Sequence, residues 1–117
     1  MPQLIKVVET DFGPTRLFEA FIDGHLVGMV TLNITQEEMV ALMVDSAYRR
    51  QGVATALIGE VEASAEKGGM RRVFATVFLE NEASNALWRG RGYLELTKYE
   101  RWFGGHPIKE TEDATTG

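Results

Sequence analysis

Cysteine is absent from the 117 residues of this chain. Its absence excludes disulfide bonds, thiolate metal sites and a cysteine nucleophile. The two histidines, His25 and His106, are isolated from each other and have no carboxylates at metal-ligand spacing. Such histidines are far more often surface residues than ligands, so we expect no bound metal.

Long apolar runs and a basic excess are missing as well. No apolar run approaches the length that spans a membrane, and residues 1–6 do not resemble the start of a secretory signal. We therefore expect a cytoplasmic protein that does not enter a membrane. The formal net charge of -5 argues against nucleic acid as a partner, because nucleic-acid binders carry a basic face. It mildly favours a cationic partner such as an amine.

The composition that is present, 44% hydrophobic and 25% charged, is typical of a globular protein. The length fits a single compact domain. We assign this domain to residues 1–104. Residues 105–117 are polar and predict a flexible tail.

The first half of the sequence predicts an antiparallel meander. Asp23-Gly24 lies between two runs of strand-forming residues and is typical of a two-residue hairpin turn, because glycine tolerates a positive φ. A second turn signal covers residues 11–14, and a polar break covers residues 35–38. The expected strands are residues 4–10, 15–22, 25–34 and 39–44.

The second half predicts helices that alternate with strands. Apolar residues recur at helical spacing over residues 52–67, with Glu60, Glu62 and Glu66 mostly on the other side, and two glycines then end the helix. A strand over residues 73–79, a helix over 82–90 and a strand over 93–103 follow. The predicted fold class is α/β (α+β), with a mixed, mostly antiparallel sheet and a central parallel β–α–β unit.

The segment between the fourth strand and the first helix has the features of a phosphate-binding site. A helix start exposes unpaired N–H groups, Gly52 lets an anion approach the backbone, and Arg49 and Arg50 add positive charge. An ordinary strand-to-helix turn with surface arginines is the alternative. A dinucleotide or Walker-type site is disfavoured, because neither Gly-x-Gly-x-x-Gly nor Gly-Lys-Ser/Thr occurs.

Two blocks of the sequence resemble the GNAT superfamily of acyl-CoA-dependent N-acetyltransferases. In the first block, Arg49, Gly52 and Ala54 fill the fixed positions of the family pattern Arg/Gln-x-x-Gly-x-Gly/Ala. The second block, residues 81–88 followed by Gly92-Tyr93, resembles the asparagine-led helix and Gly-Phe/Tyr of the family. The resemblance covers about residues 26–103. It implies the GNAT fold and transfer of an acetyl group from acetyl-CoA to a primary amine by direct attack in a ternary complex.

The resemblance also implies which residues bind acetyl-CoA. In the family, the fourth and fifth strands splay apart and the pantetheine arm pairs with the fourth strand like an added strand. Backbone amides at the helix start hold the pyrophosphate, and the asparagine-led helix flanks the thiol end. The implied residues are Leu42, Met43, Val44, Arg49, Arg50, Gln51, Gly52, Val53, Ala54, Thr55, Asn81, Ser84 and Trp88.

The catalytic groups are harder to assign from the resemblance. Glu38 is the candidate base, because it begins the fourth strand and shares parity with residues 40, 42 and 44; a solvated turn made with Glu37 is the alternative. Trp88 occupies the position where the family usually has a tyrosine acid. An indole N–H has no useful acidity, so water or Ser84 would have to protonate the leaving thiolate.

The link between the first two strands is too short for the two helices that the family usually has there. The acceptor side is therefore open, completed by a second subunit, or suited to a flat macromolecular amine. We expect a homodimer. An acyl-CoA-binding or regulatory module without catalysis is the alternative function, and a nucleotide-binding α/β domain is a poorer third.

Overall fold

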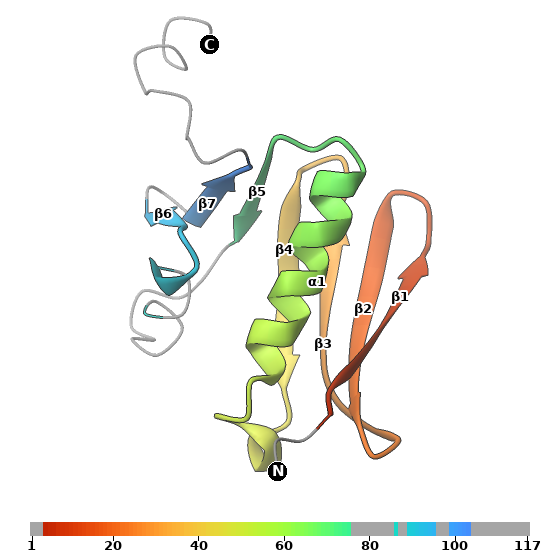
Figure 1. Ribbon diagram of the computed structural model, residues 1–117. Helices are drawn as coiled ribbons and strands as arrows, with labels where there is room; N and C mark the ends of the chain where they lie inside the picture. The colour runs from red at the N-terminus through yellow and green to blue at the C-terminus, as the bar shows by residue number, and fades with distance from the viewer. Residues whose placement is uncertain (1–3, 76–85, 87–88, 96–98, 104–117) are drawn as a thin grey trace, which may run out of the picture.

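The computed structural model describes residues 4–75, 86, 89–95 and 99–103. Its strands form one seven-stranded sheet in the order β1-β2-β3-β4-β5-β7-β6, and α1 packs on one face of it (Figure 1). The elements are β1 (Lys6–Asp11), β2 (Thr15–Ile22), β3 (His25–Asn33), β4 (Glu38–Val44), the 3-10 helix η1 (Ser46–Tyr48), α1 (Val53–Lys67), β5 (Arg72–Ala75), β6 (Leu94–Glu95) and β7 (Tyr99–Trp102).

The predicted antiparallel meander of β1 to β4 is confirmed. Asp23 and Gly24 have φ values of 51° and 78°, as a two-residue hairpin turn requires. At the β1–β2 turn, the Asp11 carboxylate accepts a hydrogen bond from the Gly13 N–H at 2.8 Å. β1 therefore passes directly into β2, with no helix between the two strands.

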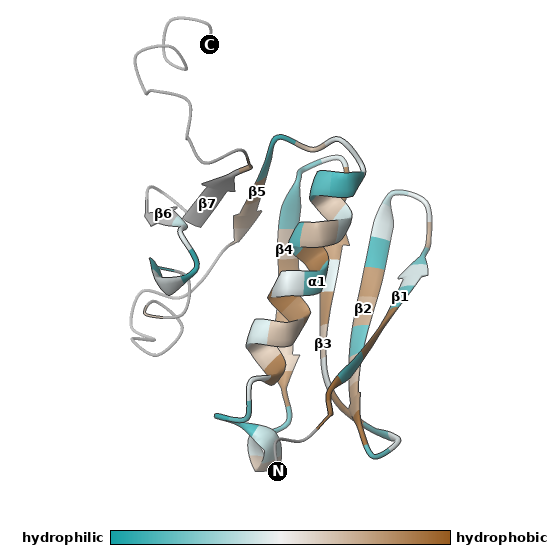
Figure 2. Cartoon of the chain, viewed as in Figure 1, coloured by the Kyte–Doolittle hydropathy of each residue, from teal (hydrophilic) through white to brown (hydrophobic). Residues whose placement is uncertain are grey.

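The core lies between α1 and the sheet. Alternate residues of β2, Phe18, Ala20 and Ile22, are buried, and Figure 2 shows apolar stretches on this strand interrupted by polar bands. Each large aliphatic side chain buried here contributes about 1.5–3 kcal/mol. The buried apolar residues are Phe18, Ala20, Ile22, Val27, Val30, Leu32, Met39, Val53, Leu57, Ile58, Val61, Ala65, Val73, Ala75 and Tyr93.

Gly28 on β3 sets how closely α1 approaches the sheet. A Cβ at this position would lie 2.9 Å from Cγ1 of Val53 and 3.0 Å from the carbonyl oxygen of Met43. The first distance is shorter than real Cβ contacts, and the second is tighter than nine in ten of them. Glycine therefore lets the first turn of α1 rest directly on β3 beside β4.

The side-chain alternation of β4 is interrupted at Ala41. Met43 pairs with Met29 but Val40 pairs with Thr31, so one extra residue is inserted, and Ala41 has a φ of 57°. Such a β-bulge reverses which face the following residues occupy. Glu38 therefore shares a face with Val40. The prediction that it also shares the face of residues 42 and 44 is wrong, because Leu42 and Val44 pack against the core.

The predicted parallel β–α–β unit is confirmed. β4 and β5 are parallel neighbours joined through α1, with Glu38 opposite Phe74 and Met39 opposite Ala75. The Phe74 N–H donates a 2.7 Å hydrogen bond to the carbonyl oxygen of Glu37. The strand was expected to run to residue 79, and its part beyond Ala75 lies outside the described residues.

The prediction of a single final strand over residues 93–103 is wrong. Leu94 pairs with Glu100 and Glu95 with Tyr99, so β6 and β7 form an antiparallel pair, and β7 lies between β5 and β6. The sequence between them has no Gly or Pro turn signal that would have marked the reversal. Of the helix expected over residues 82–90, residues 86, 89 and 90 are helical, and the others lie outside the described residues.

The face of the sheet opposite α1 carries apolar side chains that reach the surface. By strand alternation, the exposed Val8, Val40 and Met43 belong to this face, and Leu26 lies beside them opposite Phe21. No described helix covers it (Figure 1). Within the described part of the chain, no helix is long and apolar enough to cross a membrane.

Candidate functional site

The chain between β4 and α1 folds into a compact turn. The side chain of Asp45 begins η1 by accepting a 2.9 Å hydrogen bond from the Ala47 N–H. The side-chain amide of Gln51 donates to the carbonyl oxygen of Ala47 at 3.4 Å. These local contacts bring residues 49–52 to the start of α1.

The backbone at the start of α1 presents hydrogen-bond donors. Arg50 and Gly52 have φ values of 63° and 86°, and left-handed residues of this kind turn neighbouring N–H groups into an anion-binding concavity. The first intrahelical bond of the turn runs from the Ala56 N–H to the Gly52 carbonyl oxygen at 2.9 Å. The N–H groups of residues 53–55 therefore have no intrahelical acceptor, and no side chain caps them.

The approach to this helix end is open. A Cβ added at Gly52 would meet a single described atom within 4 Å, Cδ1 of Ile5 at 3.9 Å. The side chains of Arg49, Arg50 and Gln51 are exposed around it. The turn thus combines backbone donors, the positive end of a helix dipole and two arginines, which is the arrangement that binds a phosphate.

The residues expected to bind the cofactor differ in whether their side chains or only their backbone groups are accessible to it. The Val53 side chain is 1% exposed and belongs to the core, so it can contribute only its amide. Ala54 is half-buried and Thr55 is exposed. On β4, Leu42 and Val44 face the core, whereas the side chain of Met43 is 61% exposed on the opposite face.

The two glutamates at the start of β4 have different surroundings. The Glu37 carboxylate pairs with Nε of Arg72 at 3.3 Å, and the Arg72 guanidinium lies 4.6 Å from the ring centroid of Phe74. Glu37 is therefore ion-paired rather than simply solvated. Glu38 is half-buried, opposite Asn33 and Phe74, on the sheet face away from α1.

Asn81, Ser84 and Trp88 lie outside the described residues. Among the described residues, no group of three or more His, Asp or Glu side chains could hold a metal ion.

A buried polar network on α1 was missed by the sequence reasoning, which placed Glu62 on the polar side of the helix. Glu62 is 5% exposed, and its carboxylate accepts hydrogen bonds from Nη2 of Arg91 at 2.5 Å and from the Tyr93 hydroxyl at 2.8 Å. The hydrogen bond to Glu62 raises the pKa of Arg91, although burial of the guanidinium opposes this. The one feature of the sequence that could have indicated the burial of Glu62 is its position beside the apolar residues of the helix.

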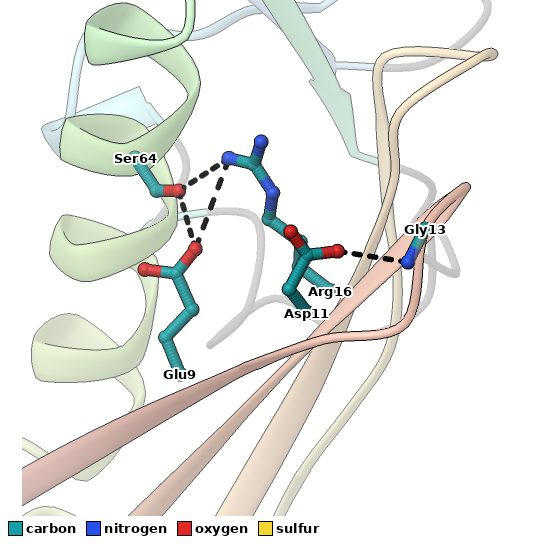
Figure 3. Close-up of polar contacts among 5 residues, drawn as sticks. All are labelled: Glu9, Asp11, Gly13, Arg16 and Ser64. Atoms are coloured by element: carbon teal, nitrogen blue, oxygen red, sulfur yellow. Dashed lines mark hydrogen bonds and ion pairs between the residues drawn. The ribbon is translucent and has the colours of Figure 1, made fainter.

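A second polar cluster joins α1 to β1 and β2. The Ser64 hydroxyl accepts from Nη1 of Arg16 and donates to Oε2 of Glu9, both at 2.8 Å (Figure 3). The cluster borders a cavity of about 500 Å³ that also touches Asp11 and Lys67. Because these three groups satisfy one another, we assign them to holding the helix on the sheet.

Comparison with known proteins places this chain in a family. The Acetyltransferase (GNAT) family matches residues 3–93, which is most of the chain. The PaiA N-acetyltransferase of Thermoplasma acidophilum, solved in complex with coenzyme A, has a TM-score of 0.68 at 19% identity over 77% of this chain and 62% of that chain. A GNAT family acetyltransferase of Elizabethkingia anophelis with acetyl-CoA bound has a TM-score of 0.71 at 13% identity over 79% and 77%.

Among curated proteins, the uncharacterised protein YdhI of Bacillus subtilis (strain 168) is 27% identical over 70 residues. The match covers 60% of this chain and 44% of YdhI, so the chain spans less than half of that relative. The TM-scores show that this chain shares the fold of these solved structures. The chain belongs to the GNAT acetyltransferase family.

Proposed function

We propose that the protein is a cytoplasmic N-acetyltransferase that transfers an acetyl group from acetyl-CoA to a primary amine by direct attack in a ternary complex. The observation that carries the proposal is the start of α1, where a left-handed Gly52, open first-turn amides and two exposed arginines meet. The similar proteins of Thermoplasma acidophilum and Elizabethkingia anophelis hold coenzyme A and acetyl-CoA, which supports the choice of acyl donor.

Acetyl-CoA binds with its pyrophosphate at this helix start. The amides of residues 50–55 and the helix dipole hold the phosphate oxygens, while Arg49 and Arg50 contribute charge. The pantetheine arm runs along β4 and pairs with the backbone of residues 42–44. Asn81, Ser84 and Trp88 flank the thiol end.

The reaction forms one bond and breaks another. The neutral amine nitrogen attacks the thioester carbon, so the C–N bond forms and the C–S bond breaks as the thiolate leaves. Glu38, half-buried at the start of β4, takes the proton of the attacking amine through a water molecule. The thiolate then takes a proton from water, or from the Ser84 hydroxyl, which regains a proton from water.

Because Trp88 stands at the position of the tyrosine acid, protonation of the leaving thiolate is slower but still possible. A thiol has a pKa of about 8.5, so the thiolate leaves tolerably well at neutral pH. General acid catalysis is worth roughly 10²–10⁴-fold, and a good leaving group places the loss toward the lower end. Replacing Trp88 by Tyr therefore raises turnover, and unchanged turnover would mean that protonation is not limiting.

A second copy of the chain completes the acceptor side of the site in this proposal. The direct passage of β1 into β2 and the exposed apolar residues opposite α1 support it. Sedimentation would show a dimer. A monomer with full activity would contradict this part of the proposal.

The alternative is an acyl-CoA-binding or regulatory module without catalysis. Trp88 at the tyrosine position and the direct β1–β2 connection favour this alternative. The two functions differ in whether coenzyme A thiol is released from acetyl-CoA in the presence of small amines, peptides or protein amines. Binding without release on any acceptor supports the module and contradicts the enzyme.

Substitution of Gly52 tests the binding site itself. Gly52→Glu places a negative charge where the pyrophosphate binds, so we expect the Kd for acetyl-CoA, measured by calorimetry, to rise about 100-fold. Gly13→Glu is the matched control, because Gly13 also has a left-handed φ, 84°, and no described atom lies within 4 Å of its added Cβ. The control should bind normally. Equal affinity in both variants would remove the assignment of this turn.

A further inference from the structure

Among the residues that the structure describes, the buried charged side chain is that of Glu62. It lies on the flank of α1 that also carries the buried Ile58 and Ala65. A carboxylate is costly to remove from water, whereas an aliphatic side chain would pack there without this cost. The presence of a carboxylate therefore calls for a role that an apolar residue cannot perform.

Two described partners of this carboxylate come from one short turn of the chain. Arg91 donates from both Nε and Nη2, at 3.4 Å and 2.5 Å, and the Tyr93 hydroxyl donates at 2.8 Å. Between them, Gly92 has a φ of 87°, and its N–H donates to the carbonyl oxygen of Arg89 at 3.1 Å. The left-handed glycine thus lets two side chains on either side of it reach one carboxylate.

These hydrogen bonds fix the orientation of the donors relative to the Glu62 carboxylate as well as their distance from it. A guanidinium that donates in a fork holds a carboxylate in a defined plane, and the Tyr93 hydroxyl, on a side chain that is 3% exposed, adds a third donor. The turn of residues 89–93 is therefore held in one orientation on α1.

The same helix begins at the proposed pyrophosphate site. Glu62 follows Val53 by nine residues, which is roughly 13 Å along a rigid helix. The turn held by Glu62 follows Trp88 directly in the sequence. One helix is thus connected both to the phosphate end of the proposed acyl donor and to the end of the segment assigned to its thiol.

We propose that Glu62 is a positioning residue for acyl transfer. It fastens the turn of residues 89–93, which directly follows Trp88 in the sequence, to the helix that begins at the pyrophosphate site. This inference rests on the proposed function. It predicts that loss of the carboxylate disturbs the thiol end more than the phosphate end.

The test uses Glu62→Gln and Tyr93→Phe in a Trp102→Phe background, where Trp88 is the one tryptophan left of two. We expect Glu62→Gln to lower kcat roughly 10- to 100-fold, since a small misplacement of reacting groups has effects of this size. The Kd for acetyl-CoA should stay within about two-fold, because the phosphate site is untouched. The emission of Trp88 should shift. Tyr93→Phe keeps the ion pair and should show the same changes at smaller size.

Ser64→Ala is the matched control. Ser64 lies on the same helix and makes two side-chain hydrogen bonds, but its partners are Arg16 and Glu9 on β2 and β1. Its loss should lower stability in urea without changing kcat or Trp88 emission. If Glu62→Gln behaves in the same way as this control, Glu62 is structural only and the proposal is overturned.

The emission measurement separates this inference from the proposed function. If the parent protein shows no turnover with any amine, the proposed function fails, while the Trp88 emission of the two variants still decides the positioning role. Unchanged emission in both variants overturns the inference, whether or not the enzyme is active. If Glu62→Gln does not fold, Tyr93→Phe alone carries the test.

Discussion

The polar groups in the two halves of α1 differ in whether they have hydrogen-bond partners within the protein. At its start, the amides of residues 53–55 have no intrahelical acceptor and the nearby arginines are exposed. Further along, Glu62 and Ser64 each have side-chain partners from other elements. Both halves pack on the sheet through apolar side chains, but the side-chain hydrogen bonds to other elements lie in the later turns, and the amides of the first turn stay available to a ligand.

The largest effect is expected from removing the buried carboxylate. Glu62→Ala removes the carboxylate that accepts hydrogen bonds from Arg91 and Tyr93. Breaking a buried ion pair costs about 3–5 kcal/mol in typical cases. Because the Arg91 side chain is 26% exposed, we expect a loss of about 2–4 kcal/mol in the free energy of unfolding. Urea unfolding followed by circular dichroism measures it. A loss no larger than that of a surface substitution would show that the network does not hold the helix.

The raised pKa of Arg91 gives this prediction a pH dependence. A base whose pKa is higher in the folded state contributes stability that is fully present below its unfolded pKa and is lost as the pH rises through the folded value. For Arg91 this window lies above the ordinary pKa of an arginine, which is far above neutral pH. The contribution of its charge should therefore stay constant from neutral pH to about pH 10. A steep fall in the Glu62-dependent stability over that range would contradict the assignment.

Next in size is the close approach of the first turn of α1 to β3. Gly28→Ala forces a Cβ against Val53 and the Met43 carbonyl, so we expect a loss of about 1–3 kcal/mol from overpacking. Gly59→Ala is the control, because its Cβ meets Arg91 at an ordinary 3.6 Å. Alanine also favours a helix interior by about 1 kcal/mol, so this control should be unchanged or more stable. Equal loss in both variants would mean that Gly28 has no special packing role.

Smaller effects are expected from the exposed arginines at the first turn. Arg49→Ala and Arg50→Ala should each weaken acetyl-CoA binding by about 1 kcal/mol, roughly five-fold, and should reduce its dependence on salt. Lys67→Ala removes an exposed positive charge at the other end of the same helix and serves as the control. If it weakened binding as much, the effect would reflect overall charge and not the turn.

The smallest effect is expected from the exposed cluster at β1 and β2. Ser64→Ala removes two hydrogen bonds that are partly open to solvent, so a loss of about 1 kcal/mol in unfolding free energy is expected. The Kd for acetyl-CoA should not change. A higher Kd in this variant would show that the two halves of α1 are coupled, which would contradict the contrast between them.

Much of the fold could be predicted, and the failures have identifiable causes. The bulge at Ala41 gives no sequence signal, since alanine rarely has a positive φ, and the parity of Glu38 was misjudged for this reason. The described partners of Glu62 lie about thirty residues away, beyond the reach of helical periodicity. Of the candidate site, the turn at Gly52 has the open, left-handed backbone that a phosphate site needs. The assignment of its ligand stays a prediction.

The sequence by itself determined the meander, the helix of residues 53–67 and the parallel unit around it. It could do so because periodicity, turn glycines and helix ends depend on interactions between residues close in the chain. Only the tertiary structure decided the insertion of β7 beside β5, the reversal of faces within β4 and the burial of Glu62. Strand order, register and the partners of a buried charge depend on contacts between distant segments, and local pattern carries no information about which segments will meet.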